Sequence, residues 1–199
     1  MDAALKNTAP SEAMTLARHA ADGDREATAK LLKMLAPRLA RVVRAVLGAS
    51  HPDLDDAIQL SLIGFVQALP AFRGECDPSG YATTIAVRTA VATRKRAHIH
   101  RARHEQATET IPEHAPSPSE SVEAHKRKEI VRDLMGQLPA EQAETLAMRV
   151  VLGWSREEIA QHTGAPVNTV RSRMRLAKEA LKKRIEGNVA LLEALEVET

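Results

Sequence analysis

Two segments of the chain concentrate side chains that bind phosphate. Between Arg88 and His104 there are six arginines and lysines and no acidic residue. Between Val167 and Arg184 there are seven, against a single glutamate. The whole chain carries a formal net charge of only +2, so these cations are gathered rather than spread. An isolated basic run is usually a solvated helix surface, but two runs that each adjoin a motif favour a nucleic acid as the ligand.

The second basic segment has the pattern of a helix-turn-helix. Ser155 and Glu158 form an S-x-x-E capping box, which predicts a short helix that ends at the left-handed turn of Gly164. Pro166 fits the first position of the following helix, and Val170 is the apolar wedge between the two helices. On this last helix an apolar stripe lies beside a cationic one: Val170, Met174, Ala177 and Leu181, then Arg171, Arg175, Lys178 and Lys182.

Such a helix buries one side and presents the other to a DNA major groove. Arg171 is placed to donate two hydrogen bonds to guanine, and Asn168 or Ser172 to reach base edges or phosphate. A helix over Glu141–Leu152, stopped by Gly153, precedes the motif, with Leu146, Ala147, Val150 and Val151 expected to face inward. The alternative is a helical hairpin that packs against another protein.

The first hundred residues predict a small helical bundle. Asp24 is the expected N-cap of a helix whose apolar positions recur every three or four residues from Leu31 to Val46, and Pro37 inside it should kink or split that helix. A second helix runs from Leu54 to Leu69. A loop from Phe72 to Gly80 leads into a third, basic helix from about Tyr81 to His104.

Composition agrees with an all-α fold of two small helical domains. Hydrophobic residues make up 44% of the chain but aromatic residues only 2%, which is unlike large sandwiches and barrels. Three prolines in the segment 107–121 indicate a flexible linker between the domains. The single cysteine excludes an internal disulfide and suits the cytoplasm, and we expect neither a leader nor a membrane-spanning segment.

Other chemistry is poorly supported. Asp53, Asp55 and Asp56 lack the glycine and glutamate of a calcium loop, so helix capping and an acidic patch for a partner are the better interpretation. No cysteine or carboxylate completes a zinc shell around His98, His100 and His104. Phosphate-binding glycine loops and nucleophile elbows are missing, and we expect no enzyme, no metal and no cofactor.

Several stretches resemble the extracytoplasmic-function (ECF) sigma factors of bacterial RNA polymerase. Similar to region four of that family are LPAEQ from Leu138, GWSREEIA from Gly153 and PVNTVRSRM from Pro166. Similar to region two are GDREA from Gly23, APRL from Ala36, DDAIQ from Asp55, ALPAFRG from Ala68 and IAVR from Ile85. The resemblance covers roughly residues 20–105 and 135–186, in the order of the family.

The resemblance implies a subunit that binds core RNA polymerase, recruits it to promoter DNA and helps to open the start site. Region two would dock on the clamp helices of the beta-prime subunit through Asp55, Asp56 and Gln59. It would recognise and melt the −10 element with Phe72, Arg73, Tyr81, Thr84, Arg88, Arg94, Lys95 and Arg96. Region four would read the −35 element with Asn168, Thr169, Arg171, Ser172, Arg173, Arg175 and Lys178. An anti-sigma factor is a further expected partner.

The expected organisation is a region-two domain over 1–105, a linker over 106–125, a region-four domain over 126–186 and a tail over 187–199. Two alternatives stay open. One is a promoter-binding regulator that uses the helix-turn-helix without replacing sigma, and the other is a sigma-like adaptor that binds a protein partner but no DNA. Binding of core polymerase by residues 20–105 separates the first alternative from a sigma factor. A steep salt dependence of DNA binding separates the second.

Overall fold

The computed structural model describes residues 11–105, 120–188 and 191, and within them it is built from helices without a strand. These elements follow one another along the chain as α1 (Glu12–Ala21), α2 (Arg25–Leu47), α3 (Leu54–Ala68), the 3₁₀ turn η1 (Leu69–Ala71), α4 (Pro78–Glu105), α5 (Glu120–Gly136), α6 (Ala140–Val151), α7 (Arg156–Thr163) and α8 (Val167–Glu186). The all-α prediction is confirmed for this part of the chain.

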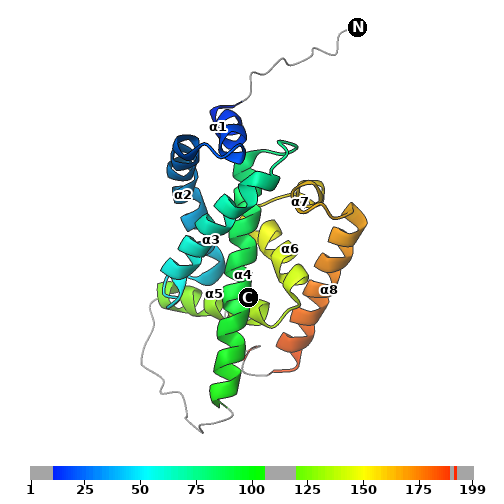
Figure 1. Cartoon of the computed structure of the whole chain (residues 1–199). Coiled ribbons are helices and arrows are strands. Elements are labelled where there is room, and N and C mark those ends of the chain that lie inside the picture. Colours follow the sequence, from blue (N-terminus) through cyan, green and yellow to red (C-terminus); the bar gives the residue numbers. More distant parts are fainter. Residues whose placement is uncertain (1–10, 106–119, 189–190, 192–199) are drawn as a thin grey trace.

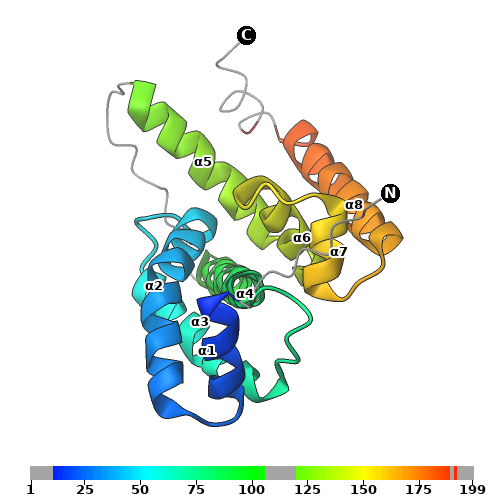
Figure 2. The same ribbon diagram turned by 90° about the horizontal axis from the view of Figure 1, so that it is seen from above.

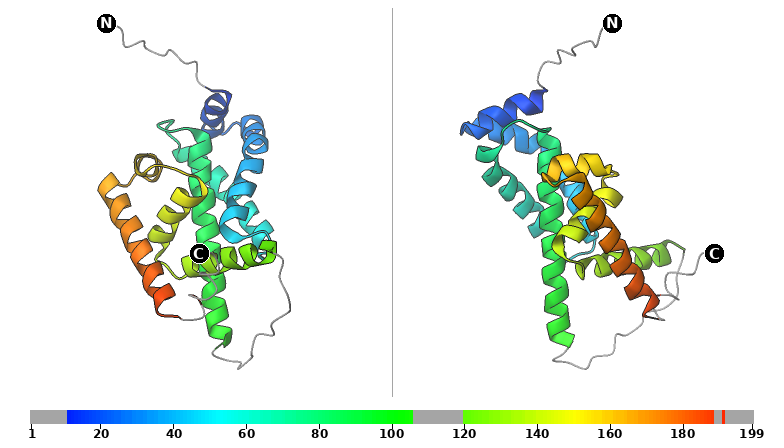
Figure 3. Two further views of the ribbon diagram at one scale, coloured as in Figure 1. Left: turned by 180° about the vertical axis from the view of Figure 1, so that it is seen from behind. Right: turned by 90° about the vertical axis from the view of Figure 1, so that its right-hand side faces the viewer.

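The long helix α4 is the centre of the molecule. Helices α1, α2 and α3 pack on one side of it, and α6, α7 and α8 lie on the other (Figures 1 and 2). Helix α5 runs across the lower half of α4 and connects the two groups (Figure 3). Buried residues of both groups form one continuous hydrophobic cluster, which includes Leu39 of α2, Val87 of α4 and Met148 of α6.

Helix starts in the N-terminal group are set by capping side chains. The Asp24 carboxylate accepts hydrogen bonds from the backbone N–H groups of Glu26 and Ala27 at 2.8 and 3.0 Å, which satisfies donors that a helix start leaves free. The N-cap predicted from the sequence is therefore confirmed. Helix α1 was not predicted; the Ser11 hydroxyl caps it by accepting from Met14 N–H.

Helix α2 buries the stripe that the spacing predicts, and its members Leu31, Leu35, Leu39, Val42 and Val46 are all buried. Of the two outcomes predicted for Pro37, the split does not occur, because α2 is continuous from Arg25 to Leu47, and the kink stays a prediction. Pro37 lacks an N–H group and leaves the carbonyl of Lys33 without its helical donor. Both residues are exposed, so water can hydrate that carbonyl.

Helix α6 is buried on two sides, since it packs against both α4 and α8. Leu146 and Ala147 face inward as predicted, and Thr145 and Met148 are buried as well. The expectation that Val150 would face inward is wrong: its exposed fraction is 70%. Val150 lies in the last turn, on a side that neither neighbouring helix covers.

The boundary between the domains differs in one respect from the predicted linker of 106–125. Helix α5 begins at Glu120, so residues 120–125 are helical, while residues 106–119 lie outside the described part. The predicted tail of 187–199 is described only at residues 187, 188 and 191. No described helix is both long enough and apolar enough to cross a membrane.

Candidate nucleic-acid and polymerase interfaces

The cationic stripe of α8 lies on the surface, as the sequence predicts. Val170 and Ala177 are fully buried against the core, whereas Arg171, Arg175 and Lys178 are exposed. Beside α8 there is an open groove of about 500 Å³, whose charged lining comes from three helices: Arg149, Arg156, Glu157, Arg171, Arg175 and Lys178. Five cations against one acid make this groove attractive to a phosphate backbone.

The turn that carries α8 is built as the motif predicts. Ser155 N–H donates to the Glu158 carboxylate at 2.7 Å, and Glu158 N–H donates to the Ser155 hydroxyl at 3.1 Å, so the capping box is present. Gly164 takes the left-handed conformation with φ +71° and ends α7. Pro166 is the N-cap of α8 rather than its first helical residue, one position from the expectation.

The other predicted region-four contacts have different surroundings. Asn168 and Ser172 are exposed, and Thr169 is half-buried. Arg175 pairs with Glu179 of the same helix at 2.8 Å, with both side chains open to water. Arg173 points instead toward α6, where its guanidinium lies 2.6 Å from the Glu141 carboxylate. Arg173 is thus paired within the C-terminal helices in this structure.

On helix α4, fewer of the residues predicted to contact DNA are exposed than on α8. Thr84 and Arg94 are buried, with exposed fractions of 2% and 5%. The Thr84 hydroxyl donates to the Gly80 carbonyl of its own helix at 3.1 Å. Arg88 is half-exposed and lies 3.5 Å from the Glu144 carboxylate of α6. Lys95 is half-buried, and Arg96 is exposed and donates to Thr93 at 3.2 Å.

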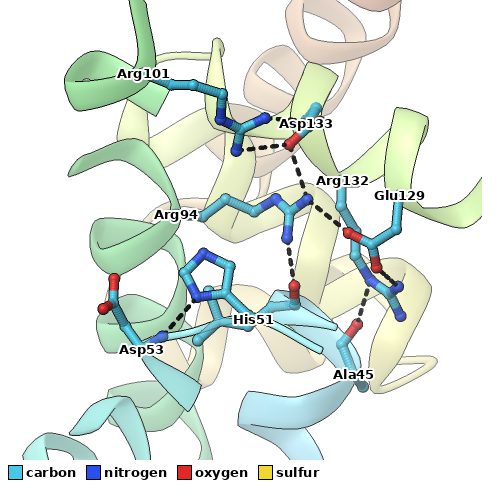
Figure 4. Close-up of polar contacts among 9 residues, drawn as sticks. Ala45, His51, Asp53, Arg94, Arg101, Glu129, Arg132 and Asp133 are labelled. Carbon is cyan, nitrogen blue, oxygen red and sulfur yellow. Dashed lines mark hydrogen bonds and ion pairs between the residues drawn. The ribbon is translucent and has the colours of Figure 1, made fainter. Parts of the chain in front are cut away.

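Arg94 links three elements (Figure 4). Its guanidinium donates to the Leu47 carbonyl at the end of α2 and lies 3.3 Å from Glu129 and 3.0 Å from Asp133 of α5. Arg101, on the next turn but one of α4, lies 3.2 Å from the same Asp133. Burial lowers the pKa of Arg94, and the two carboxylates oppose that change. Arg94 is therefore a buried polar contact between the domains, in addition to the hydrophobic cluster that both share.

The loop and the start of α4 carry an aromatic cluster. The ring of Tyr81 lies 5.3 Å from that of Phe72 and 6.4 Å from that of Phe65, centroid to centroid. The Tyr81 hydroxyl donates to the Ala68 carbonyl at 3.4 Å. Phe72 and Tyr81 are only partly buried, and Arg73 beside them is exposed. Partly exposed rings next to a cation are the surface on which an unpaired base can stack.

Helix α3 presents an unusual outer face. Asp55, Asp56 and Gln59, the residues predicted to meet polymerase, are all exposed. Along the same face lie large apolar side chains that the sequence analysis did not single out: Leu60, Ile63 and Val66, exposed by 43%, 51% and 36%. An acidic start followed by an exposed apolar stripe is typical of a protein-docking surface.

Comparisons with known proteins find a match in the N-terminal helices and another in the C-terminal helices. Residues 31–98 match the family described as Sigma-70 region 2, and residues 128–181 match Sigma-70, region 4. The ECF RNA polymerase sigma factor SigD of Mycobacterium tuberculosis is 32% identical over 173 residues, which cover 82% of this chain and 79% of SigD. The chain belongs to the ECF sigma factors.

Two further relatives give the same picture at lower similarity. The ECF RNA polymerase sigma-E factor of Haemophilus influenzae is 28% identical over 149 residues, covering 69% of this chain and 77% of that protein. The solved structure of CnrH in complex with the cytosolic domain of CnrY has the same fold, with a TM-score of 0.53 at 19% identity over 89% of this chain and 99% of that one.

As an ECF sigma factor, the protein is a transcription initiation factor whose partners are RNA polymerase and promoter DNA. Every residue predicted to contact DNA or polymerase falls within one of the two matched regions. The roles of these individual residues stay predictions, because the matches identify regions rather than contacts.

Burial shifts the pKa of two side chains where the regions of the sigma factor meet. It raises the pKa of the Glu144 carboxyl, against the opposing effect of Arg88. It lowers the pKa of His162 on α7, with Asp77 and Glu158 opposing and Arg38 reinforcing that change. The His162 ring stacks on Trp154 at 4.4 Å, and its Nδ1 is buried without a hydrogen-bond partner.

No group of three or more potential metal ligands gathers among the described side chains of the sigma factor. Cys76 is a half-buried free thiol. The His104 side chain lies outside the described residues.

Sequence reasoning missed two sets of functional candidates. Arg149 and Arg156 line the groove beside α8, although they come from the end of α6 and the start of α7. The second set is the acidic residues that face the basic helices: Glu129, Asp133, Glu141 and Glu144. Their spacing is ordinary for a solvated helix, so only tertiary packing reveals their partners.

Proposed function

We propose that the helix-turn-helix of region 4 reads the −35 element and that region 2 recognises and melts the −10 element. The observation that carries the first part is the groove beside α8, where Arg149 and Arg156 extend the cationic stripe of Arg171, Arg175 and Lys178. Phosphate contacts from such a groove fix the register of the helix on DNA. Arg171, Ser172 and Asn168 then reach base edges from the exposed N-terminal turns of α8.

In this proposal the surface around the start of α4 opens the DNA strands. Phe72 and Tyr81 offer partly exposed rings for an unstacked base, and Arg73 offers a cation beside them. Thr84, Arg88, Arg94, Lys95 and Arg96 continue this surface along α4. Because Thr84 and Arg94 are buried here, this second contact requires the C-terminal helices to move away.

The outer face of α3 docks on the clamp helices of the polymerase beta-prime subunit. Asp55, Asp56 and Gln59 supply polar contacts, and Leu60, Ile63 and Val66 supply apolar area that water otherwise covers. Action on polymerase and promoter DNA places the protein in the cytoplasm and gives it no catalytic step of its own. A protein that covers α3 or α4, such as an anti-sigma factor, would act as an inhibitor.

Run-off transcription with purified core polymerase tests this proposal. The full chain is added to core enzyme on fragmented genomic DNA, and discrete transcripts that depend on it are expected. Asp56→Arg should abolish core binding and transcription while leaving binding to duplex DNA intact, since Asp56 lies on the α3 face. Glu26→Gln is the control: Glu26 is exposed, and among the residues that the structure describes its carboxylate pairs only with Lys30 of the same helix.

The same experiment separates the alternatives. A regulator that does not replace sigma would bind duplex DNA but would not associate with core polymerase. An adaptor without DNA binding would associate with core polymerase and yield no specific transcript. Either result overturns the proposal.

A further inference from the structure

Four carboxylates of the C-terminal helices contact arginines of α4 and α8, and three of these arginines, Arg88, Arg94 and Arg173, are among the predicted DNA contacts. Glu129 and Asp133, one turn apart on α5, contact Arg94, and Asp133 also contacts Arg101. Glu144 of α6 contacts Arg88. Glu141, on the preceding turn of α6, contacts Arg173 of α8. We call the three that contact α4, namely Glu129, Asp133 and Glu144, the carboxylate clasp.

The clasp joins the two regions through contacts that are unlike ordinary surface ion pairs. The Arg94 side chain is only 6% exposed, and its third partner is a backbone carbonyl at the end of α2. Glu144 is 21% exposed, and burial raises its pKa. Glu129 is held in place by Arg132, which also donates to the Ala45 carbonyl at 3.3 Å (Figure 4). Such partly desolvated pairs are screened less by salt than exposed ones.

We infer that the free protein is closed on itself, with the carboxylate clasp occupying the positions on α4 that nucleic-acid phosphate takes when the protein is at work. A carboxylate is the protein group that best imitates phosphate toward a guanidinium. The partner of the basic face of α4 is therefore the C-terminal region of the same chain. Opening exchanges these three carboxylates for phosphates.

One consequence rests on the proposed function. The groove beside α8 stays open in the closed arrangement, whereas Thr84, Arg88 and Arg94 of α4 are covered or paired. The closed protein can therefore hold a duplex through region 4, whereas it offers an opened strand only part of region 2, because Thr84 and Arg94 are buried and Arg88 is paired. Self-closure then delays melting until polymerase separates the regions.

A second contact between the regions offers a test that does not alter charge. Gly80 in the first turn of α4 packs directly against the imidazole of His162 on α7, and a Cβ at Gly80 would overlap that ring. Gly80→Ala should thus push α7 away from α4. Alanine also favours a helix over glycine, so α4 itself should gain stability.

Pulsed electron paramagnetic resonance measures the closure directly. Nitroxide labels are placed at Lys33→Cys on α2 and Lys182→Cys on α8, both exposed positions, in the Cys76→Ser background. The variants compared are Glu129→Gln with Asp133→Asn, Gly80→Ala, and the control Glu26→Gln. Circular dichroism establishes that each variant is folded.

A narrow distance distribution is expected for the parent and for the control. A longer, broader distribution is expected for the clasp variant and for Gly80→Ala. Unchanged distances in the clasp variant overturn the inference. Opening by Gly80→Ala alone also overturns it, since the carboxylates would then not hold the regions together.

Binding of a single-stranded oligonucleotide, followed by fluorescence anisotropy without nitroxides, tests the consequence for region 2. If about one molecule in ten is open, full opening by the clasp variant tightens this binding about tenfold, because apparent affinity scales with the open fraction. Duplex binding through α8 should change less. Longer distances without tighter strand binding would support self-closure and count against the proposed role of α4 in melting.

Discussion

The two basic helices of this sigma factor look alike in sequence and differ in the structure. Helix α8 keeps its buried residues on one side, so Arg171, Arg175 and Lys178 face solvent. Helix α4 is packed against helices of both regions, and Arg94 is among its buried residues. The number of cations on a helix therefore does not tell which of them can reach DNA; the neighbours of the helix decide it.

The largest expected effect is a loss of stability when the buried arginine of α4 is removed. Arg94→Ala removes the contacts to Leu47, Glu129 and Asp133 and leaves two carboxylates without their partner. We expect the free energy of unfolding to fall by about 2–3 kcal/mol, below the usual loss for a buried pair because both carboxylates are over a third exposed. Urea denaturation followed by circular dichroism measures it.

Arg101→Ala is the matched control, since Arg101 meets the same Asp133 with its side chain 52% exposed. Its loss should stay within about 1 kcal/mol. Equal losses for the two arginines would mean that burial does not distinguish them.

The next effect concerns the exposed helix. Arg171→Ala should weaken duplex binding by about 1–3 kcal/mol and relax selectivity at one promoter position, because a bidentate contact to guanine is lost. Lys182→Ala on the same stripe should weaken binding evenly across sequences and lower the salt slope by about one. Anisotropy titrations against a set of single-base promoter variants measure both. A selective loss from Lys182→Ala would contradict its assignment to phosphate.

Much of this fold could be predicted because its signals are local. The cap of Asp24, the capping box of Ser155 and Glu158 and the left-handed Gly164 each depend on residues within one turn, and all three are confirmed. Apolar spacing likewise placed the buried face of α2. Local signals left open whether Pro37 would kink or split α2, because its cost depends on whether water reaches the carbonyl of Lys33.

The candidate site was less predictable because its contacts span the chain. Arg94 pairs with residues 35 and 39 positions away, across the segment predicted as a linker. The linker composition indicated independent domains, and nothing in the local pattern shows that α5 and α6 pack on α4. The exposed Val150 follows from the same cause, since the inward faces of α6 are set by two neighbours.

A smaller effect tests how α8 is positioned. Ser155→Ala removes the hydroxyl that accepts from Glu158 N–H and should cost about 1 kcal/mol of stability. Because α7 supports α8, duplex affinity should fall slightly and single-stranded binding should not change. Thermal unfolding measures the change in stability, and fluorescence anisotropy measures the affinities for duplex and single-stranded DNA. A loss on single strands of the same size would show that the helix-turn-helix and α4 are not separate contacts.

The smallest expected effect is a pH dependence at the contact between α4 and α7. Burial lowers the pKa of His162 from its ordinary value of 6.5, in the presence of Asp77, Glu158 and Arg38. The unfolded chain therefore takes up the proton first, and stability should decline as the pH falls below about 6.5. Glu144, whose pKa is raised, acts in the opposite direction.

The slope of melting temperature against pH between 7.5 and 5.5 measures this dependence in the parent and in His162→Asn. The variant should lose stability at every pH but show a flatter decline. A parallel decline in both proteins would assign the pH dependence to other groups.

Chemical modification of arginines by phenylglyoxal tests the contrast between α4 and α8 most directly. The reagent is applied to the free protein without substitutions or labels, and mass spectrometry locates the arginines that have reacted. Arg171 and Arg96 are exposed and should react much faster than Arg94. Equal rates for Arg94 and Arg171 at low salt would contradict a covered α4 beside an open α8.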